Sequence, residues 1–144
     1  MNPYSITTLD RQALERTLAF IASWSRDDAY DRFGTLGDAG PRWLARELRE
    51  NRERGALVAS DGTRIVGLLD YIYASHAVHF GVVVHEAQRR KRIGSALVHA
   101  LLGADDRHAL AECRADNRAA VALLRGCGFQ CTGYDAHEMH WRRA

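Results

Sequence analysis

Residues 82–102 read VVVHEAQRRKRIGSALVHALL, and this stretch decides how the fold is interpreted. It begins with three valines, a β-branched run typical of a buried strand. It ends with apolar residues at helical spacing, which predict an amphipathic helix: Ile93, Leu97, Ala100 and Leu101. Between them stand four consecutive cations at residues 89–92, with no Ser, Thr, Asp or Asn cap between Glu86 and Gly94. Because a helix start attracts anions, this junction suggests a phosphate-binding site, with a solvated basic turn or a nucleic-acid patch as alternatives.

The bulk composition is that of an ordinary globular domain. The chain has 144 residues, 47% of them apolar and 26% charged, which is enough for one domain with its own core, expected over residues 1–144. The formal net charge is only +2, so the cationic run is local and no nucleic-acid partner is expected. No apolar run approaches the ~18 residues of a membrane span and no signal-peptide core is visible, which predicts a cytoplasmic protein without a membrane partner.

Cysteine and histidine usage favours neither a disulfide framework nor a metal site. Cys113, Cys127 and Cys131 form an odd set. Two of them share residues 127–140 with two histidines, but the spacing does not match that of a zinc site. We therefore expect buried thiols and edge-strand histidines, and no metal.

Hydrophobic periodicity predicts an α/β (α+β) chain with elements in the order α, α, β, β, β, α, β, α, β, β. Besides the helix already described, the expected helices cover residues 8–23, 41–54 and 116–129, with a helical turn and a loop in 24–40. The expected strands cover residues 56–60, 63–74, 76–84, 108–115 and two short segments within 129–143. The strands 76–84 and 108–115 flank a helix and should therefore lie parallel, joined by a right-handed crossover. The result is a mixed sheet of about six to seven strands with about four helices on its faces.

Glycines set the expected boundaries of several elements. Gly55 is expected to end the second helix, and Gly126 or Gly128 the last one. Hairpin turns, each connecting two strands, are expected at the two residues Asp61–Gly62 and at Gly133–Asp135.

Two motifs in the sequence resemble signatures of the GNAT superfamily of N-acetyltransferases. Val84, Arg89 and Gly94 match the pattern Val-x-x-x-x-Arg/Gln-x-x-Gly-x-Gly/Ala, with Arg92 in place of its first glycine. The segment NRAAVALLRGCGF, residues 117–129, matches the pattern Asn-x-x-Ala followed by Gly-Phe. The resemblance extends over roughly residues 4–143. A weaker likeness links SRDDAYDRFGTL, which begins at residue 25, to bacterial protein-lysine acetyltransferase domains.

The resemblance implies acetyl-CoA as cosubstrate and a primary amine, on a protein lysine or a small molecule, as acceptor. Main-chain groups of Val82 and Val84 would pair with the pantetheine arm, and amides up to Ser95 would hold the pyrophosphate. The implied cofactor-binding residues are Val82, Val83, Val84, Arg89, Arg90, Lys91, Arg92, Ile93, Gly94, Ser95 and Asn117. The amine would attack the thioester directly in a ternary complex. The alternative is a non-catalytic acyl-CoA-binding sensor on the same fold, and the sequence is compatible with a homodimer.

Three residues are candidates for the general base that such a reaction needs. His79 aligns with a glutamate of the bacterial lysine acetyltransferase domains, while Glu112 and Asp70 lie on neighbouring strands. Strand alternation places His79, Gly81 and Val83 on one face. The tyrosine that usually serves the family as general acid is replaced by Leu124, which is the main support for the sensor alternative. By the same resemblance, the cluster Tyr30, Arg32 and Phe33 would line the acceptor side.

Overall fold

The computed structural model describes residues 4–34, 37–62, 64–85, 92–104, 107–135 and 137–143. Its strands are β1 (Ser5–Thr8), β2 (Arg54–Ser60), β3 (Ile65–Ala74), β4 (Ala77–Val84), β5 (His108–Arg114), β6 (Gln130–Asp135) and β7 (Glu138–Arg143). Its helices are α1 (Arg11–Ala22), α2 (Arg26–Phe33), α3 (Ala39–Glu50), α4 (Ile93–Ala104) and α5 (Arg118–Gly126). Among these helices, none is long and apolar enough to cross a membrane.

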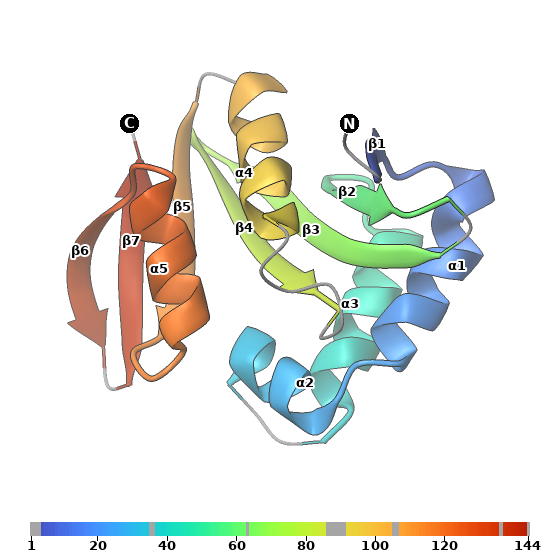
Figure 1. Ribbon diagram of the computed structural model, residues 1–144, viewed down its shortest axis with the longest axis horizontal. Coiled ribbons are helices and arrows are strands. Elements are labelled where there is room, and N and C mark those ends of the chain that lie inside the picture. Colours follow the sequence, from blue (N-terminus) through green and yellow to red (C-terminus); the bar gives the residue numbers. More distant parts are fainter. Residues whose placement is uncertain are drawn as a thin grey trace.

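The seven strands form one sheet in the order β1-β2-β3-β4-β5-β7-β6 (Figure 1). β4 and β5 pair in parallel, and every other neighbouring pair is antiparallel. The prediction of a mixed sheet of six to seven strands is therefore confirmed, as is the parallel pair around the central helix. Two parallel neighbouring strands need a long crossover connection from the end of one strand to the start of the other, and this connection contains α4.

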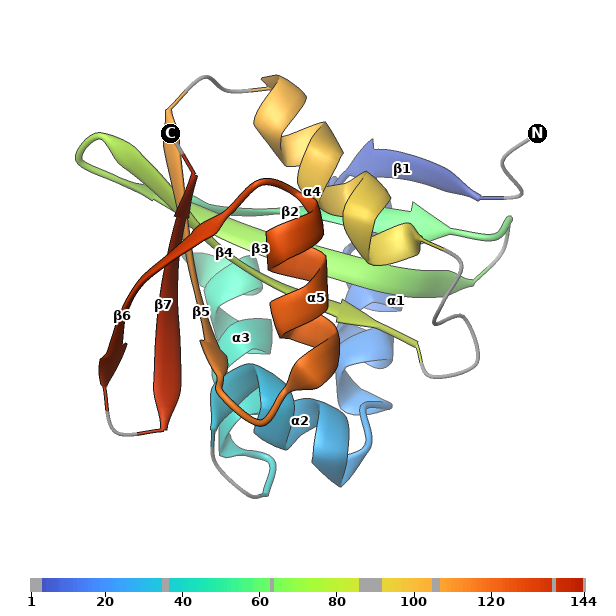
Figure 2. The ribbon, with the colours of Figure 1, turned by 60° about the vertical axis from the view of Figure 1, so that its left-hand side comes forward.

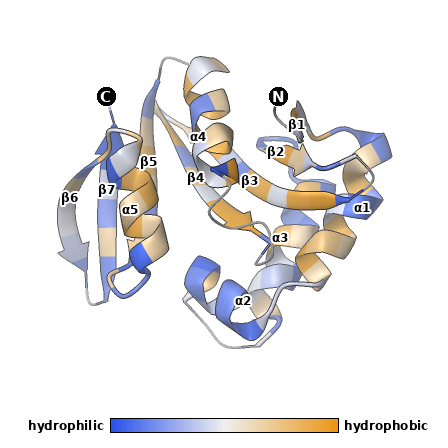
Figure 3. Ribbon diagram, viewed as in Figure 1, coloured by the Kyte–Doolittle hydropathy of each residue, from blue (hydrophilic) through white to orange (hydrophobic). Residues whose placement is uncertain are grey.

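Helices cover both faces of the sheet (Figure 2). α1, α2 and α3 lie on one side, here named the α2 face, and α4 and α5 lie on the other, named the α4 face. On the α2 face, Leu18 and Ile21 of α1 and Leu44 of α3 pack against Val58 and Leu68 of the sheet. The α4-face core is larger and includes Ile93, Leu97, Leu101, Leu124, Phe129 and Trp141. The central strands are mainly apolar because both of their faces are covered, whereas α2 is mainly hydrophilic (Figure 3).

Alternation along the strands decides which side chains reach each face. Val78 and Phe80 are buried in the α4-face core, which leaves His79 and Gly81 on the α2 face. On β5, Ala111 is likewise buried on the α4 face, so its neighbour Glu112 lies on the α2 face.

The element count differs from the prediction at two places. Residues 26–33 form a full helix, α2, where only a helical turn was expected, so the described part of the chain has five helices instead of about four. The side chain of Ser25 caps this helix, accepting a hydrogen bond from the Asp28 N–H, and Gly34 ends it in the left-handed conformation. β1 was not expected, because its four residues are mostly exposed and it forms as an edge strand through pairing with β2.

Three predicted boundaries were wrong. Gly55 does not end α3 but lies within β2, where an added Cβ would come within 2.6 Å of the Tyr71 ring. In the first hairpin β2 ends at Ser60 and β3 begins at Ile65, and the Asp61 N–H donates to the Arg64 carbonyl at 3.0 Å, so the turn does not lie at Asp61–Gly62 as expected; a register shift between Ala59 and Ser60 accompanies it. The last hairpin turns after Asp135, because Gly133 lies within β6 beside a register shift.

Candidate functional site

The edge of β4 that faces β5, here named the open edge, has no strand partner among the described residues beyond the point where β4 and β5 separate. The two strands pair from Ala77↔His108 to Phe80↔Ala111, and their pairing ends there. β5 continues alongside β7, and β4 continues alongside β3 as far as Gly67↔Val84. The divergence of the two strands is visible in Figure 1. No described strand pairs with the open edge of β4 beyond Phe80.

The open edge exposes the main-chain groups that the sequence pointed to. The His85 N–H donates to the Val66 carbonyl of β3 at 2.7 Å, so residue 85 directs its main-chain groups toward β3. Because N–H and C=O directions alternate along a strand, those of Val82 and Val84 point the other way, toward the open edge. Val83 lies between them, with its buried side chain on the α2 face opposite Leu68.

α4 begins next to this edge in an unusual backbone conformation. Arg92 precedes the helix with φ 61°, in the left-handed region that favours glycine, and its carbonyl accepts the Ala96 N–H at 3.0 Å. This residue replaces the first glycine of the motif, and the structure shows that the glycine-like conformation is kept. Ile93 is fully buried and anchors the first turn of α4. The remaining cationic predictions, Arg89, Arg90 and Lys91, lie outside the described residues.

Small residues allow the close packing at the start of α4. A Cβ added at Gly94 would lie 3.3 Å from Cδ2 of Leu123 and 3.7 Å from Cγ2 of Val84, so Gly94 lets β4, α4 and α5 approach each other. Ser95 directs its hydroxyl toward Cys127, with 3.9 Å between Oγ and Sγ.

The second motif builds α5. Asn117 is the N-cap residue, and its Oδ1 accepts a hydrogen bond from the Ala120 N–H at 3.1 Å. Leu124, at the place of the usual tyrosine, is 3% exposed and packs in the α4-face core. This position therefore presents no proton donor.

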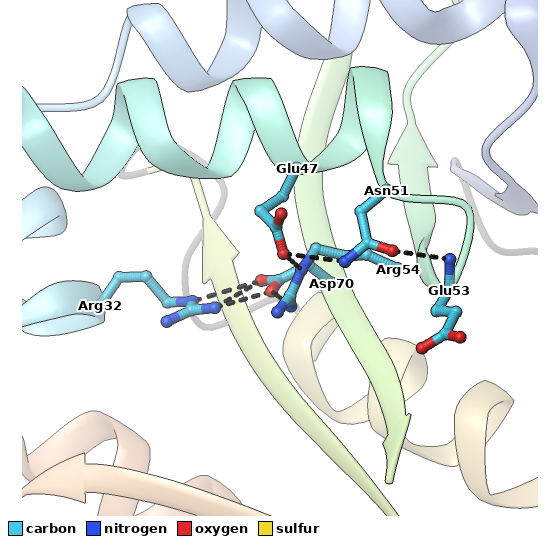
Figure 4. A network of polar contacts seen from close by, with 6 residues as sticks. All are labelled: Arg32, Glu47, Asn51, Glu53, Arg54 and Asp70. Carbon is cyan, nitrogen blue, oxygen red and sulfur yellow. Dashed lines mark hydrogen bonds and ion pairs between the residues drawn. The ribbon is translucent and has the colours of Figure 1, made fainter.

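Asp70 lies under α2 in a network of charges (Figure 4). Its carboxylate is 2% exposed and accepts hydrogen bonds from Arg32 Nη2 at 2.7 and 2.9 Å and from Arg32 Nε at 3.3 Å. Arg54 Nη1 donates to the same carboxylate at 3.1 Å, and Arg54 Nε donates to Glu47 at 3.1 Å. The Asn51 and Arg54 hydrogen bonds hold the pKa of Glu47 below its ordinary value. Both oxygens of Asp70 are thus committed to guanidinium groups.

Arg32 connects this network to β4. Its guanidinium lies directly over Gly81, and an added Cβ at Gly81 would overlap its Nε and Cζ. Gly81 is therefore required for the close approach of α2 to the sheet.

Glu112 lies on the other side of the opening. It follows Ala111, the last β5 residue paired with β4, and it shares the α2 face with Gly81. Its side chain is 59% exposed, and its Oε1 lies 3.4 Å from Nδ1 of His140 on β7. A third acid, Glu138 of β7, lies on the same face, and its pKa is raised by burial first and then by hydrogen bonding with Glu112 and by the charge of Glu112.

His79 lies on the same face but further from the opening. It is exposed, pairs with Ile72 and Leu110, and lines a surface pocket together with His76 and His108. In the part of the chain that the structure describes, no three His, Cys, Asp or Glu side chains are grouped to hold a metal ion. The structure thus brings all three predicted base candidates to one face, with Asp70 and Glu112 on opposite sides of the opening.

Glu138 was missed by the sequence interpretation. The available signal was the alternation of Glu138, His140 and Arg142 with the apolar Met139 and Trp141, which predicts a strand with one polar face.

Comparison with known proteins identifies the class to which this architecture belongs. The model of the acetyltransferase (GNAT) family matches residues 15–129. Because this match covers most of the chain, the chain belongs to the acetyltransferase (GNAT) family, whose enzymes are N-acetyltransferases. The resemblance stated from the two motifs is therefore confirmed.

Solved structures share the fold over nearly the whole chain. The GNAT domain of S. lividans PAT is 15% identical, with a TM-score of 0.83, 96% of this chain covered and 88% of that chain. The PaiA N-acetyltransferase from Thermoplasma acidophilum, solved with coenzyme A, is 13% identical, with a TM-score of 0.75 and coverage of 97% and 98%. Spermidine N-acetyltransferase from Vibrio cholerae, solved with CoA and spermine, is 14% identical, with a TM-score of 0.70 and coverage of 99% and 94%. A search of curated proteins by sequence finds no match.

Proposed function

We propose that the chain transfers an acetyl group from acetyl-CoA to a primary amine by direct attack, with the acyl donor along the open edge of β4. The observation that carries this proposal is the end of β4–β5 pairing at Phe80↔Ala111, which leaves the main-chain groups of Val82 and Val84 available. An extended amide-bearing arm can hydrogen-bond to such an edge as an added strand does.

The start of α4 fits the pyrophosphate of the same donor. Amides from Arg92 to Ser95 occupy the first turn, where they have no partners within the helix and where the dipole is positive. Arg92 is exposed and adds a positive charge to this turn, with its backbone in the left-handed conformation. Asn117, which caps α5, is the further cofactor contact that the resemblance implies.

We assign the general base to Glu112, ahead of His79 and Asp70. Glu112 is exposed and lies at the first position of β5 beyond the paired region. Asp70 is buried under two arginines whose hydrogen bonds would have to be given up for it to accept a proton. His79 is accessible, but it pairs with Leu110 and therefore lies within the paired part of β4 and β5, one residue before the last pair, Phe80↔Ala111. An alkyl ammonium has a pKa of about 10.4, so a base is needed near neutral pH.

The acceptor is expected on the α2 face. Tyr30 and Arg32 come from α2, and the Arg114 guanidinium lies 4.5 Å from the centroid of the Tyr30 ring. The Vibrio cholerae neighbour binds spermine, so spermidine and lysine peptides are the amines to test first.

Free thiol released from acetyl-CoA tests the proposal. Wild type is expected to release thiol with at least one amine, and Glu112→Gln is expected to lose about 10²-fold or more in rate while binding CoA normally by calorimetry. His79→Ala serves as the matched control and should retain most of the activity. Loss of activity in His79→Ala but not in Glu112→Gln would transfer the base assignment to His79.

A second function, an acyl-CoA sensor without turnover, is favoured by one observation. Leu124 is buried in the core, so the usual acid is absent from its place on α5. CoA binding by calorimetry without thiol release for any amine would support the sensor. The absence of any CoA binding would contradict both functions.

A further inference from the structure

We propose that Glu112 and Glu138 work as one proton-accepting pair, in which Glu112 takes the proton of the acceptor ammonium and Glu138 shares it. This inference rests on the proposed acetyl transfer and identifies a residue of β7 that assists it.

The sheet register brings the two carboxyl groups together. Glu112 of β5 lies opposite His140 of β7, and Glu138 is two positions before His140 on the same strand. Side chains in this diagonal relation across antiparallel strands point to the same face and are within reach of each other when they are long. His140 Nδ1 lies 3.4 Å from Oε1 of Glu112, and hydrogen bonding with Glu112 is among the causes that raise the pKa of Glu138.

The surroundings of the two residues differ, which gives them different tasks. Glu112 is 59% exposed and lies where β4 and β5 separate, so it can contact an acceptor. Glu138 is partly buried between β7 and the end of α2, where a Cβ added at Gly34 would lie 3.6 Å from its Oε1. Glu138 therefore acts through Glu112 and is a positioning residue.

The charges around Glu138 favour its holding a proton. Burial, the hydrogen bond to Glu112 and the negative charges of Glu112 and Asp135 raise its pKa, and the charge of His140 opposes them. The negative end of the α2 dipole at Gly34 acts in the same direction.

The cation that faces Glu138 is held mainly by other groups. Arg114 lies opposite Glu138 in the register and its charge attracts that of Glu138, but its guanidinium hydrogen-bonds to Asp116 and stacks over the ring of Tyr30. Arg32, the nearest cation of α2 in sequence to Gly34, is bonded to Asp70.

A shared proton makes the pair a stronger base than a single exposed glutamate. Two adjacent carboxylates repel each other, so a proton delivered to either is held by both and the apparent pKa belongs to the pair. A higher apparent pKa of the pair lies closer to the ammonium pKa of about 10.4, so proton transfer from the ammonium to the pair costs less free energy. In the step itself, one N–H bond of the ammonium breaks and one carboxyl O–H bond forms. The electron pair left on nitrogen forms the new C–N bond, and the C–S bond breaks to release the thiolate. The second nitrogen proton passes to the thiolate or to solvent, and the glutamate pair then returns its own proton to solvent.

The pH dependence of kcat/KM, measured by thiol release, tests the pair. In wild type we expect activity to be lost at low pH with a midpoint above the ordinary glutamate range. Glu138→Gln keeps the shape and a hydrogen-bond donor but removes the like charge. Its midpoint should move to lower pH, and its plateau rate should fall several-fold with unchanged CoA affinity. Asp135→Asn removes a neighbouring negative charge without the hydrogen bond, and it should move the midpoint far less.

Carboxyl ¹³C NMR titration of the free protein provides a second measurement that needs no turnover. One glutamate of wild type should titrate above the ordinary range, and its midpoint should fall in Glu112→Gln without reaching the ordinary value, because burial remains. If Glu138→Gln proves unfolded, this titration of wild type and Glu112→Gln decides the question.

The outcomes separate the inference from the function on which it rests. Wild-type turnover together with an unmoved midpoint in Glu138→Gln, or an ordinary titration of Glu138, overturns the pair and leaves acetyl transfer in place. Absence of thiol release from wild type with every amine overturns the transfer itself, and the catalytic role of the pair with it.

Discussion

Replacing Asp70 by asparagine tests whether this buried carboxylate holds α2 against the sheet. Asp70 is 2% exposed and accepts from two guanidinium groups, of Arg32 and Arg54, which are 19% and 10% exposed. Asparagine keeps the volume but removes the negative charge, so two poorly hydrated cations lose their counter-ion.

The expected loss is large for a single substitution. Breaking a buried ion pair by removing one partner costs about 3–5 kcal/mol, and the partial exposure of Arg32 and Arg54 places this case at the lower end, about 3 kcal/mol. Each kcal/mol corresponds to roughly 2–4 °C in the unfolding midpoint of a chain of this size, so Tm should fall by about 6–12 °C.

Urea unfolding followed by circular dichroism measures the effect, with Asp38→Asn as the matched control. Asp38 pairs with Arg42 at 3.3 Å, but both side chains are more than 70% exposed, so this pair should contribute about 0–1 kcal/mol. Equal stability of the two variants at unchanged m-value would refute the buried-network argument. A folded Asp70→Asn that binds CoA and keeps its turnover would also remove Asp70 from the list of candidate bases.

Three further expectations follow from the backbone and the charges. Arg92→Gly should raise stability by about 1 kcal/mol in thermal unfolding, because glycine adopts the left-handed conformation without the Cβ clash; an unchanged or lower Tm would contradict the strain at this residue. Gly81→Ala should destabilise the chain by about 1–3 kcal/mol, because its Cβ would displace the Arg32 guanidinium; chemical denaturation at wild-type values would show that α2 adjusts freely. The pKa of Glu138 is raised in the folded state, so its contribution to stability is complete below the ordinary glutamate pKa and is lost as pH rises through the folded value. Tm should accordingly be similar for wild type and Glu138→Gln at low pH, where both side chains are neutral, and the Tm of wild type should fall below that of Glu138→Gln as pH rises through the transition.

The sequence predicted the centre of the fold better than its edges. The valine run and the helix after it were recognised because they are buried on both sides and carry strong periodicity. β1 has only four residues and a mostly exposed pattern, so its strand conformation depends on pairing with β2 and not on its own composition.

The candidate site was only partly predictable for a similar reason. Alternation placed His79 and Gly81 correctly on one face, because a period of two is a local property. The contact of Arg32 with Asp70 joins residues 38 positions apart, and nothing in local patterning selects Asp70 over other acids as its partner. Glu138 was not recognised because its role depends on the pairing of β5 with β7, which brings together two distant strands.

The lack of a general acid at Leu124 should slow acetyl transfer less than the lack of a general base would. A thiol of pKa about 8.5 leaves as a thiolate at little cost near neutral pH, so an acid at the place of Leu124 has little to add. An alkyl ammonium with pKa about 10.4 is almost wholly protonated under the same conditions, so removal of its proton is the larger demand. In the proposed mechanism that demand is met on the α2 face, where Glu112, Glu138 and His140 lie together at the opening between β4 and β5. The proposed mechanism therefore assigns the acceptor proton to these residues and leaves the role of the acid to solvent.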